Sequence, residues 1–368
     1  MHMLSFGSVA TVDELAGGDV AIRPVRLRCA CAAAVLVFGL ASCGEDEQVV
    51  TAPDTAFADA LATVDAPEPI GAGIGWIDVA GLNGGPDADR YLRQAGPALG
   101  PGGGDLFDEL QPELLKLDAD PYGSDMALSV HGSFTFGVRL NGVDPTQIAE
   151  IAAADGVEVE AEAEGWERYD LAERGVLPDS ELQEAADALS SHVGIADDAV
   201  VLARATQARL DLTLPARPGD ESPSLALAAE CLGDVVAARI VPNNFTYISG
   251  IGPDLFVMGM RAPTEDGPGE EVLCGVDEDG DDIQRYAEAM EKQLDPEAID
   301  VTTEEPVGEV FASADVDTLE GGGNYASRAV LTMAEGAEPG AVFRGFDVGS
   351  VETFFGLQGP SSGVPPSD

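Results

Sequence analysis

Apolar residues follow strand-like and helix-like patterns along most of this chain. Over residues 126–140, apolar and small polar residues alternate, which predicts a strand with a bend at Gly132. Residues 144–156 begin with Asp-Pro, a good N-cap and a favoured first helical residue, and end at a glycine, so they predict a helix. Residues 157–164 alternate small apolar residues with glutamate, as in an antiparallel strand with one face in water. A helix from residue 179 or 180 and a strand over residues 200–214 follow.

The second half of the chain repeats this succession of strand, helix, strand and strand. Strands are predicted over residues 255–260, 272–276, 307–312 and 329–333, and a helix is predicted to begin at Asp281. We therefore expect an α+β fold of two related units. Each unit would be an antiparallel sheet with helices on one face, similar in outline to ferredoxin-like layers.

Near the N-terminus, an apolar run follows three arginines, Arg23, Arg26 and Arg28. The run covers Ala32–Leu40 and is far shorter than the about 20 residues that a bilayer-spanning helix needs, so it predicts a signal peptide. It ends in Leu40-Ala41-Ser42-Cys43. Small residues before a cysteine at this place resemble the lipobox of bacterial lipoprotein precursors. The leader, rich in arginine and alanine, and the low lysine content are similar to those of actinobacterial lipoproteins.

This resemblance implies a location for the protein. Cys43 would carry a thioether-linked diacylglyceryl group and become the first residue of the mature chain, anchored to the outer face of the cytoplasmic membrane. Asp13, Glu14 and Asp19 suit neither a basic nor an apolar leader, and a translation start near Val20 would remove them. The alternative is a buried helix inside a domain with an incidental cysteine.

These features divide the chain into five segments. Residues 1–42 are the expected signal peptide, and residues 43–68 are an acidic, proline-containing tether. The two α+β units are expected over residues 69–250 and 251–357. Residues 358–368, rich in glycine, proline and serine, are expected to form a disordered tail.

The cysteines reduce to one pair once the leader and the lipid are accounted for. Cys29 and Cys31 lie in the expected signal peptide and Cys43 would carry lipid, so Cys231 and Cys274 remain. In an exported chain, this pair is expected to form a disulfide. Two free thiols or a metal site are the alternatives.

The composition is strongly acidic, with 18 lysine and arginine residues against 67 aspartate and glutamate residues and a net charge of −49. Nucleic-acid binding is not expected, because it depends on cationic side chains that displace counterions from phosphates. The same charge disfavours adhesion of the folded part to anionic lipids, which leaves the N-terminal lipid as the membrane contact. Because the charge is spread along the chain, it favours adaptation to a saline or alkaline medium, with a cation-binding role as the alternative.

The strongest ligand candidate is the acidic stretch over residues 277–282. Asp277, Asp279 and Asp281 flank a glycine there, and carboxylates around a glycine can wrap a calcium ion. The first and twelfth positions of such a calcium loop carry no carboxylate in this chain. The alternative is an acidic turn that caps the helix beginning there.

Catalytic motifs do not stand out in the sequence. His131 is predicted in a strand and His192 at a helix C-terminus, and neither is expected to act as a general base. Residues 71–75 are rich in glycine but lack the spacing of a dinucleotide-binding loop, so we interpret them as a turn. We expect a non-catalytic module that binds an envelope protein or a small solute. The alternative is a secreted hydrolase with a carboxylate-based site.

Overall fold

The computed structural model describes most of the chain between residues 54 and 357. The described residues are 54–64, 73–83, 88–100, 106–107, 111–115, 119–131, 136–154, 160–161, 165–170, 192–203, 210, 212–213, 222–243, 252–263, 269–300, 306–347 and 350–357. The predicted signal peptide and lipobox, the first part of the tether, the helix from residue 179 or 180 and the C-terminal tail lie outside them.

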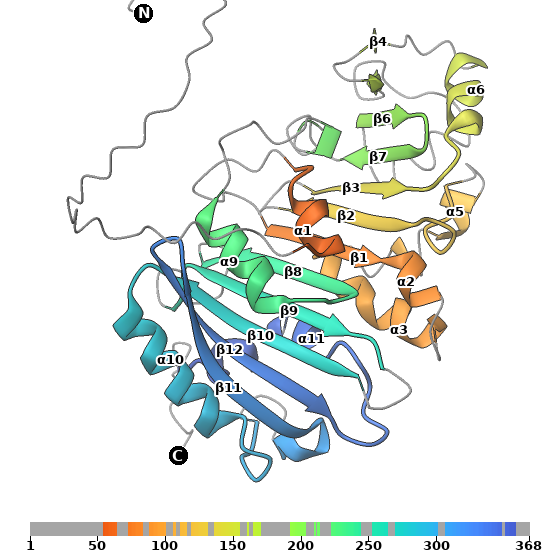
Figure 1. Ribbon diagram of the computed structural model, residues 1–368. Helices are drawn as coiled ribbons and strands as arrows, with labels where there is room; N and C mark the ends of the chain where they lie inside the picture. Colours follow the sequence, from red (N-terminus) through yellow and green to blue (C-terminus); the bar gives the residue numbers. More distant parts are fainter. Residues whose placement is uncertain are drawn as a thin grey trace, which may run out of the picture. The chain divides into compact units, whose positions relative to one another are not determined.

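Within the described residues, one antiparallel sheet of twelve strands forms the frame of the fold (Figure 1). Its strands are β1 (Gly73–Asp78), β2 (Met126–His131), β3 (Phe136–Asn141), β4 (Glu160–Ala161), β5 (Glu167–Asp170), β6 (His192–Ala196), β7 (Ala199–Ala203), β8 (Ala237–Pro242), β9 (Leu255–Arg261), β10 (Glu270–Asp277), β11 (Phe311–Gly321) and β12 (Asn324–Met333). The spatial order is β11-β12-β10-β9-β8-β1-β2-β3-β7-β6-β5-β4.

The first four strands outward from the central pair, β1 and β8, follow the same connection pattern on both sides. Moving outward, β2, β3, β7 and β6 follow on one side, and β9, β10, β12 and β11 follow on the other. The prediction of two separate ferredoxin-like units is therefore wrong, although the succession of elements does recur. The two halves are joined because Ile74 pairs with Ile240 in the β1–β8 ladder, which leaves neither strand as an open edge. Strand β8 belongs to the first unit expected from the sequence (residues 69–250) and β9 to the second (residues 251–357), and these two strands pair with each other in the same sheet.

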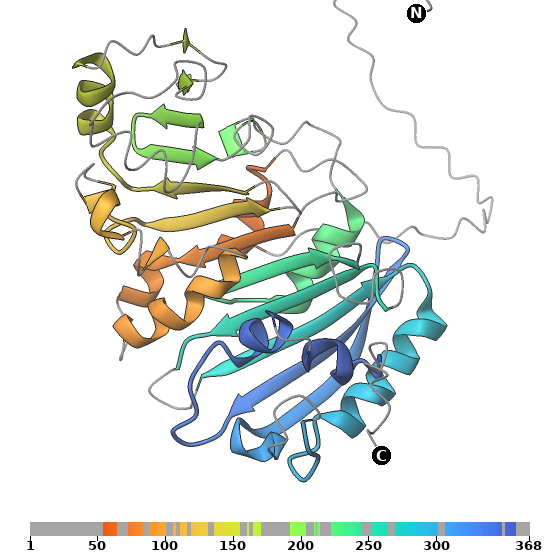
Figure 2. The ribbon, with the colours of Figure 1, turned by 180° about the vertical axis from the view of Figure 1, so that it is seen from behind.

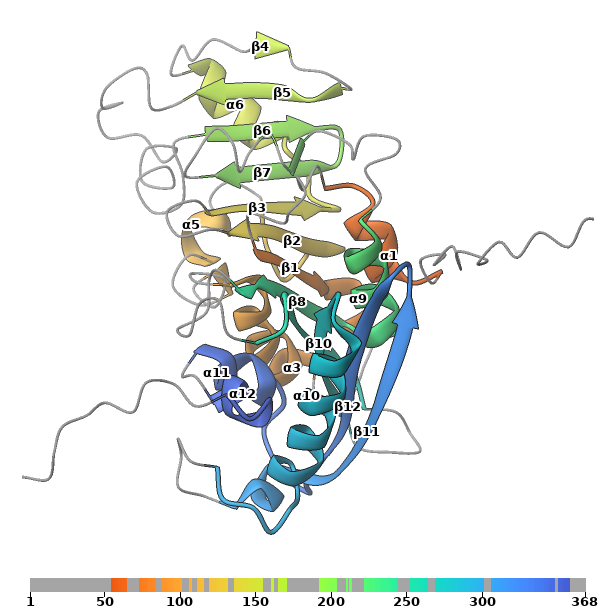
Figure 3. The same cartoon turned by 90° about the vertical axis from the view of Figure 1, so that its left-hand side faces the viewer.

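Helices cover both faces of this sheet, and not one face as the sequence predicted (Figures 1 and 3). The helices are α1 (Ala56–Leu61), α2 (Val79–Asn83), α3 (Ala88–Ala95), η1 (Gly96–Leu99), α5 (Gln111–Leu115), α6 (Thr146–Ala154), α9 (Pro223–Leu232), α10 (Gly280–Gln293), η5 (Val307–Glu309), α11 (Ala341–Asp347) and α12 (Ser350–Phe354). Helices α1 and α9 pack on one face, and α3, α10, α11 and α12 pack on the other, which Figure 2 shows from behind.

Two hydrophobic cores result, one on each face. Strand β1 illustrates this, since Trp76 belongs to the core under α1 and α9, whereas its neighbour Ile77 belongs to the core under α3 and α11. Both side chains are almost completely buried. A strand that is buried on both faces has apolar residues on both of them and does not alternate apolar with polar residues. Hydrophobic periodicity therefore does not show that helices cover both of its faces.

The glycines of β1 allow a close approach of η1. They lie inside the strand, so our interpretation of residues 71–75 as a turn is wrong for Gly73 and Gly75. A Cβ atom on Gly75 would lie 2.3 Å from the carbonyl oxygen of Ala98 and 2.5 Å from the Cα of Leu99. Glycine in a strand commonly marks a place where another part of the backbone comes close.

Several predicted strands differ in the structure. Residues 126–140 form two strands, β2 and β3, that pair with each other, and not one bent strand. Leu210, Leu212 and Thr213 are helical within the region predicted as a strand over residues 200–214. The segment 307–312 begins with the short 3-10 helix η5 before β11 starts.

The predicted disulfide between Cys231 and Cys274 is present. Cys231 lies at the end of α9 and Cys274 lies in β10, and both are completely buried. The bond ties α9 to the sheet across a sequence separation of 43 residues. Within the described part of the chain, no helix is both long and apolar enough to cross a bilayer.

Candidate functional site

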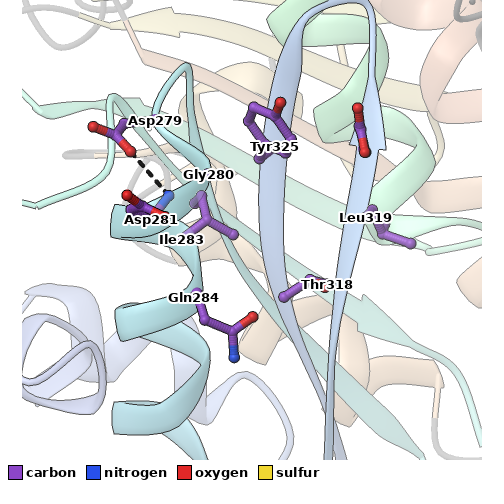
Figure 4. A pocket seen from close by; sticks show the side chains of 9 residues that line it. Asp279, Gly280, Asp281, Ile283, Gln284, Thr318, Leu319 and Tyr325 are labelled. Carbon is purple, nitrogen blue, oxygen red and sulfur yellow. Dashed lines mark hydrogen bonds between the residues drawn. The ribbon is translucent and has the colours of Figure 1, made fainter.

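A groove of about 550 Å³ lies between the start of α10 and the turn that joins β11 to β12 (Figure 4). In Figure 4, Asp279 and Asp281 lie on the α10 side, and Thr318 and Tyr325 lie on the hairpin side. The lining residues are Asp279, Gly280, Asp281, Ile283, Gln284, Thr318, Leu319, Glu320 and Tyr325. The groove thus combines three carboxylates with an amide, a hydroxyl group, a phenol and two apolar side chains.

The α10 side of the groove is shaped by helix capping. Asp279 is the N-cap of α10, and its carboxylate accepts hydrogen bonds from the backbone N–H groups of Asp281 (2.9 Å) and Asp282 (3.4 Å). The carboxylate of Asp277 accepts from the N–H of Asp279 at 2.9 Å. Such acceptors satisfy N–H groups that a helix leaves without partners at its start, and negative charge is favoured there by the helix dipole.

Asp277, Asp279 and Asp281, the predicted calcium ligands, thus lie in an acidic turn that caps a helix, which is the alternative interpretation of this stretch. Asp277 and Asp279 each accept backbone hydrogen bonds, and Asp281 lies in the first turn of the helix. Among the described residues, no group of three or more histidine, cysteine, aspartate or glutamate side chains is arranged to hold a metal ion. The calcium site stays a prediction.

The hairpin side of the groove is formed by the end of the longest strands in the sheet. Glu320 and Tyr325 are directly opposite each other in the β11–β12 ladder. The Tyr325 ring packs against the start of α10, since a Cβ on Gly280 would lie 3.4 Å from it. Gly322 and Gly323, between the two strands, have φ values of +60° and +79°, a backbone region that favours glycine.

The electrostatic environment beside the groove is negative. Burial raises the pKa of Asp277, and the charges of Asp254, Asp282 and Asp279 raise it further against the hydrogen bond from Asp279. Burial and the charge of Glu278 raise the pKa of Asp254. Because these carboxylates repel one another, a positively charged group that approached them would relieve the repulsion.

The nearby cation and phenol respond to the same field. Arg285 forms an ion pair with Asp282 one turn along α10, and this hydrogen bond raises the pKa of Arg285. Burial, followed by the charges of Asp282 and Asp277, raises the pKa of Tyr286 to about 12. The start of α10 therefore already attracts one cationic side chain of the chain itself.

A second set of polar side chains is buried at the centre of the sheet, away from the groove. Arg239 of β8 is 3% exposed and donates to Asp347 at 2.7 Å and to the carbonyl oxygen of Pro97 at 3.3 Å. Ser129 of β2 donates to the carbonyl oxygen of Leu99 at 2.7 Å. These bonds fasten η1 and the end of α11 to the middle of the sheet.

His131 lies beside this set. Its ring fits between two glycines, because a Cβ on Gly73 would lie 2.2 Å from Nε2 and one on Gly100 would lie 2.6 Å from Nδ1. Both ring nitrogens are buried and have no hydrogen-bond partner in the described structure. Burial, and secondarily the charge of Arg239, lower the pKa of His131 to about 3. His131 is the last residue of β2, as its predicted position in a strand requires.

Glu271 is a buried carboxylate that no pattern in the sequence indicates. It is completely buried in β10 and accepts from the backbone N–H groups of Ala341 (3.0 Å) and Val342 (2.7 Å), at the start of α11. Burial raises its pKa, and these hydrogen bonds and the charge of Arg344 act in the opposite direction. It caps a helix 70 residues away in sequence, so no local pattern announces it.

The remaining predicted site residues are separate from the groove. Cys43, the expected lipidation site, lies outside the described residues. His192 is the first residue of β6 and not the end of a helix, so that prediction is wrong.

Comparison with known proteins does not place the chain in a family. Neither a protein family, a curated protein nor a solved structure matches it.

Proposed function

We propose that this protein is exported, anchored to the outer face of the cytoplasmic membrane through a lipid on Cys43, and acts there as a non-catalytic binding module. Its binding site is the groove between α10 and the β11–β12 hairpin, and the groups that it binds are positively charged. The partner is an envelope protein that presents cationic side chains, or a small cationic solute.

The sequence and the disulfide support the location. The leader carries arginines, a short apolar run and Leu40-Ala41-Ser42-Cys43, in the order that export and lipidation require. The Cys231–Cys274 bond is of the kind that persists in oxidising compartments outside the cytoplasm. Each observation is independent of the other, and both favour an extracytoplasmic protein.

The groove carries the binding part of the proposal. Asp279, Asp281 and Glu320 present carboxylates around a partly apolar depression, where Ile283 and Leu319 can contact the aliphatic part of a ligand. Lysine and arginine side chains, and polyamines, combine a cationic group with such an aliphatic stem. Glu271 and Glu352, whose pKa burial raises, do not line the groove.

Calorimetric titration of the full chain with spermine tests this site. The variant Asp281→Asn/Glu320→Gln removes two groove carboxylates, and Glu335→Gln/Glu338→Gln removes two exposed carboxylates from the turn after β12. Both variants change the net charge equally. We expect the groove variant to bind spermine about twofold to thirtyfold more weakly than the control variant, because two exposed ion pairs of about 0.2–1 kcal/mol each are lost. Equal affinities for the two variants would contradict the groove as the site.

A further inference from the structure

Strand β11 forms an open edge of the sheet. It is the last strand in the spatial order and pairs with β12 on one side, while no described strand pairs with its other side (Figures 1 and 3). It has 11 residues, whereas β4, at the opposite end of the order, has two. Open edges present unpaired backbone N–H and C=O groups, and most proteins keep them short or cover them.

The edge is regular over most of its length. A register shift separates Phe311 from Ser313, and from Ser313 to Gly321 the ladder with β12 continues without interruption. Most side chains of this stretch are exposed or half-buried. The backbone of residues 313–321 is therefore in the conformation that a further strand needs on its outer side.

Carboxylates flank this edge on both faces of the sheet. On the face that carries α10, Glu320 and Thr318 of β11 lie beside Asp281 and Gln284 of the groove. On the other face are Asp315 and Asp317, both exposed. Asp317 forms an ion pair with Arg328 of the neighbouring strand, at 2.5 Å.

The charge of the edge determines which occupant fits. A second copy of this chain would bring the same acidic strand and a net charge of −49 against it, and like charges directly opposite each other destabilise a strand pair. A strand carrying lysine or arginine would instead place its cationic side chains against these carboxylates. The groove lies beside the end of the edge, so it can receive one of them.

We propose that an extended, lysine- or arginine-bearing segment of a partner protein adds to the sheet as a further strand along residues 313–321 of β11. Backbone hydrogen bonds to β11 hold the segment, and its cationic side chains on the α10 face reach Asp281 and Glu320. This inference rests on the proposed function and names its ligand class, a basic peptide in extended conformation.

A pair of ten-residue peptides tests strand addition separately from charge. The first alternates lysine and valine, and the second has the same sequence with an N-methyl group on every backbone amide, which preserves its charge and removes its backbone hydrogen-bond donors. We expect the full chain to bind the first peptide at least about tenfold more tightly, because several backbone hydrogen bonds are lost in the second. Hydrogen exchange should show the amides of residues 313–321 protected by the first peptide alone.

Each other outcome has a distinct meaning. Equal binding of the two peptides without protection of β11 would overturn strand addition and leave a groove that binds cationic groups. Failure of both peptides to bind would overturn the proposed function as well. A dimer of the full chain that protects residues 313–321 without any peptide would show that a second copy occupies the edge, and would also overturn the inference. The Asp281→Asn/Glu320→Gln variant should weaken the first peptide more than the Glu335→Gln/Glu338→Gln control does.

Discussion

Acid should destabilise this protein through His131. The imidazole has a pKa of about 3 in the folded protein, against an ordinary value of 6.5 in the unfolded chain, because it is enclosed between Gly73 and Gly100 and faces the charge of Arg239. Between these two values the unfolded chain binds a proton that the folded protein does not. The contribution of His131 to stability is therefore complete above pH 6.5 and is lost as the pH falls toward about 3.

The size of this effect follows from the two pKa values. At about pH 5, a group with a pKa of 6.5 when unfolded and about 3 when folded lowers the free energy of unfolding by about 2 kcal/mol relative to about pH 7.5. Glu271 and Glu352 act in the opposite direction, since burial raises their pKa and the folded protein binds their protons more tightly. The contribution of His131 must therefore be obtained as a difference between proteins.

Urea unfolding of wild type and His131→Gln at both pH values gives that difference. We expect wild type to lose about 2 kcal/mol more than the variant between about pH 7.5 and about pH 5. His192→Gln, which removes an imidazole from the partly exposed start of β6, is the matched control. In case His131→Gln does not fold, the imidazole C–H proton resonance of His131 in wild type should keep its position over the same pH range. A resonance that titrates near 6.5, or equal pH dependence of wild type and variant, would show that His131 does not have the lowered pKa in the folded protein.

Three further substitutions test the described contacts. Gly75→Ala should lower the free energy of unfolding by about 1–3 kcal/mol, because its Cβ would meet the backbone of η1, whereas Gly123→Ala, whose Cβ would lie 3.5 Å from its nearest neighbour, should have a smaller effect in the same urea titration. Cys231→Ala/Cys274→Ala should lower it by about 2–5 kcal/mol, as loss of a native disulfide does, and a change under about 1 kcal/mol would contradict a stabilising role for the bond. Glu271→Gln should reduce the loss of stability as the pH rises above 4.5, because the raised pKa of Glu271 means that the folded protein holds its proton longer; an unchanged pH profile would argue against that raised pKa.

Local signals in the sequence predicted some elements well. Helix α10 begins one residue before the predicted start at Asp281, because its N-cap and its apolar stripe are both encoded within a few residues. The disulfide was predicted by counting cysteines. By contrast, the single sheet depends on the β1–β8 ladder, which pairs Ile74 with Ile240, and periodicity carries no information on such distant pairing.

Only one wall of the candidate site could be predicted from the sequence, because the other wall depends on pairing between distant segments. Asp279 and Asp281 stand in an acidic stretch that the sequence singled out, and they form one wall of the groove. Glu320, Thr318 and Tyr325 form the other wall, and the sequence did not indicate them. Residues 312–317 of β11 do alternate apolar and polar residues, and Ala314 and Val316 pack against the core, but this pattern does not show that the strand lies beside the start of α10.

Intact-mass spectrometry of the protein from the membrane fraction of its native host tests whether Cys43 carries a lipid anchor. We expect a chain that begins at Cys43 and carries acyl groups, with a mass that rises by about two daltons on reduction as the Cys231–Cys274 bond opens. A soluble, unacylated protein that retains residues before Cys43 would contradict the lipid anchor and the location proposed with it.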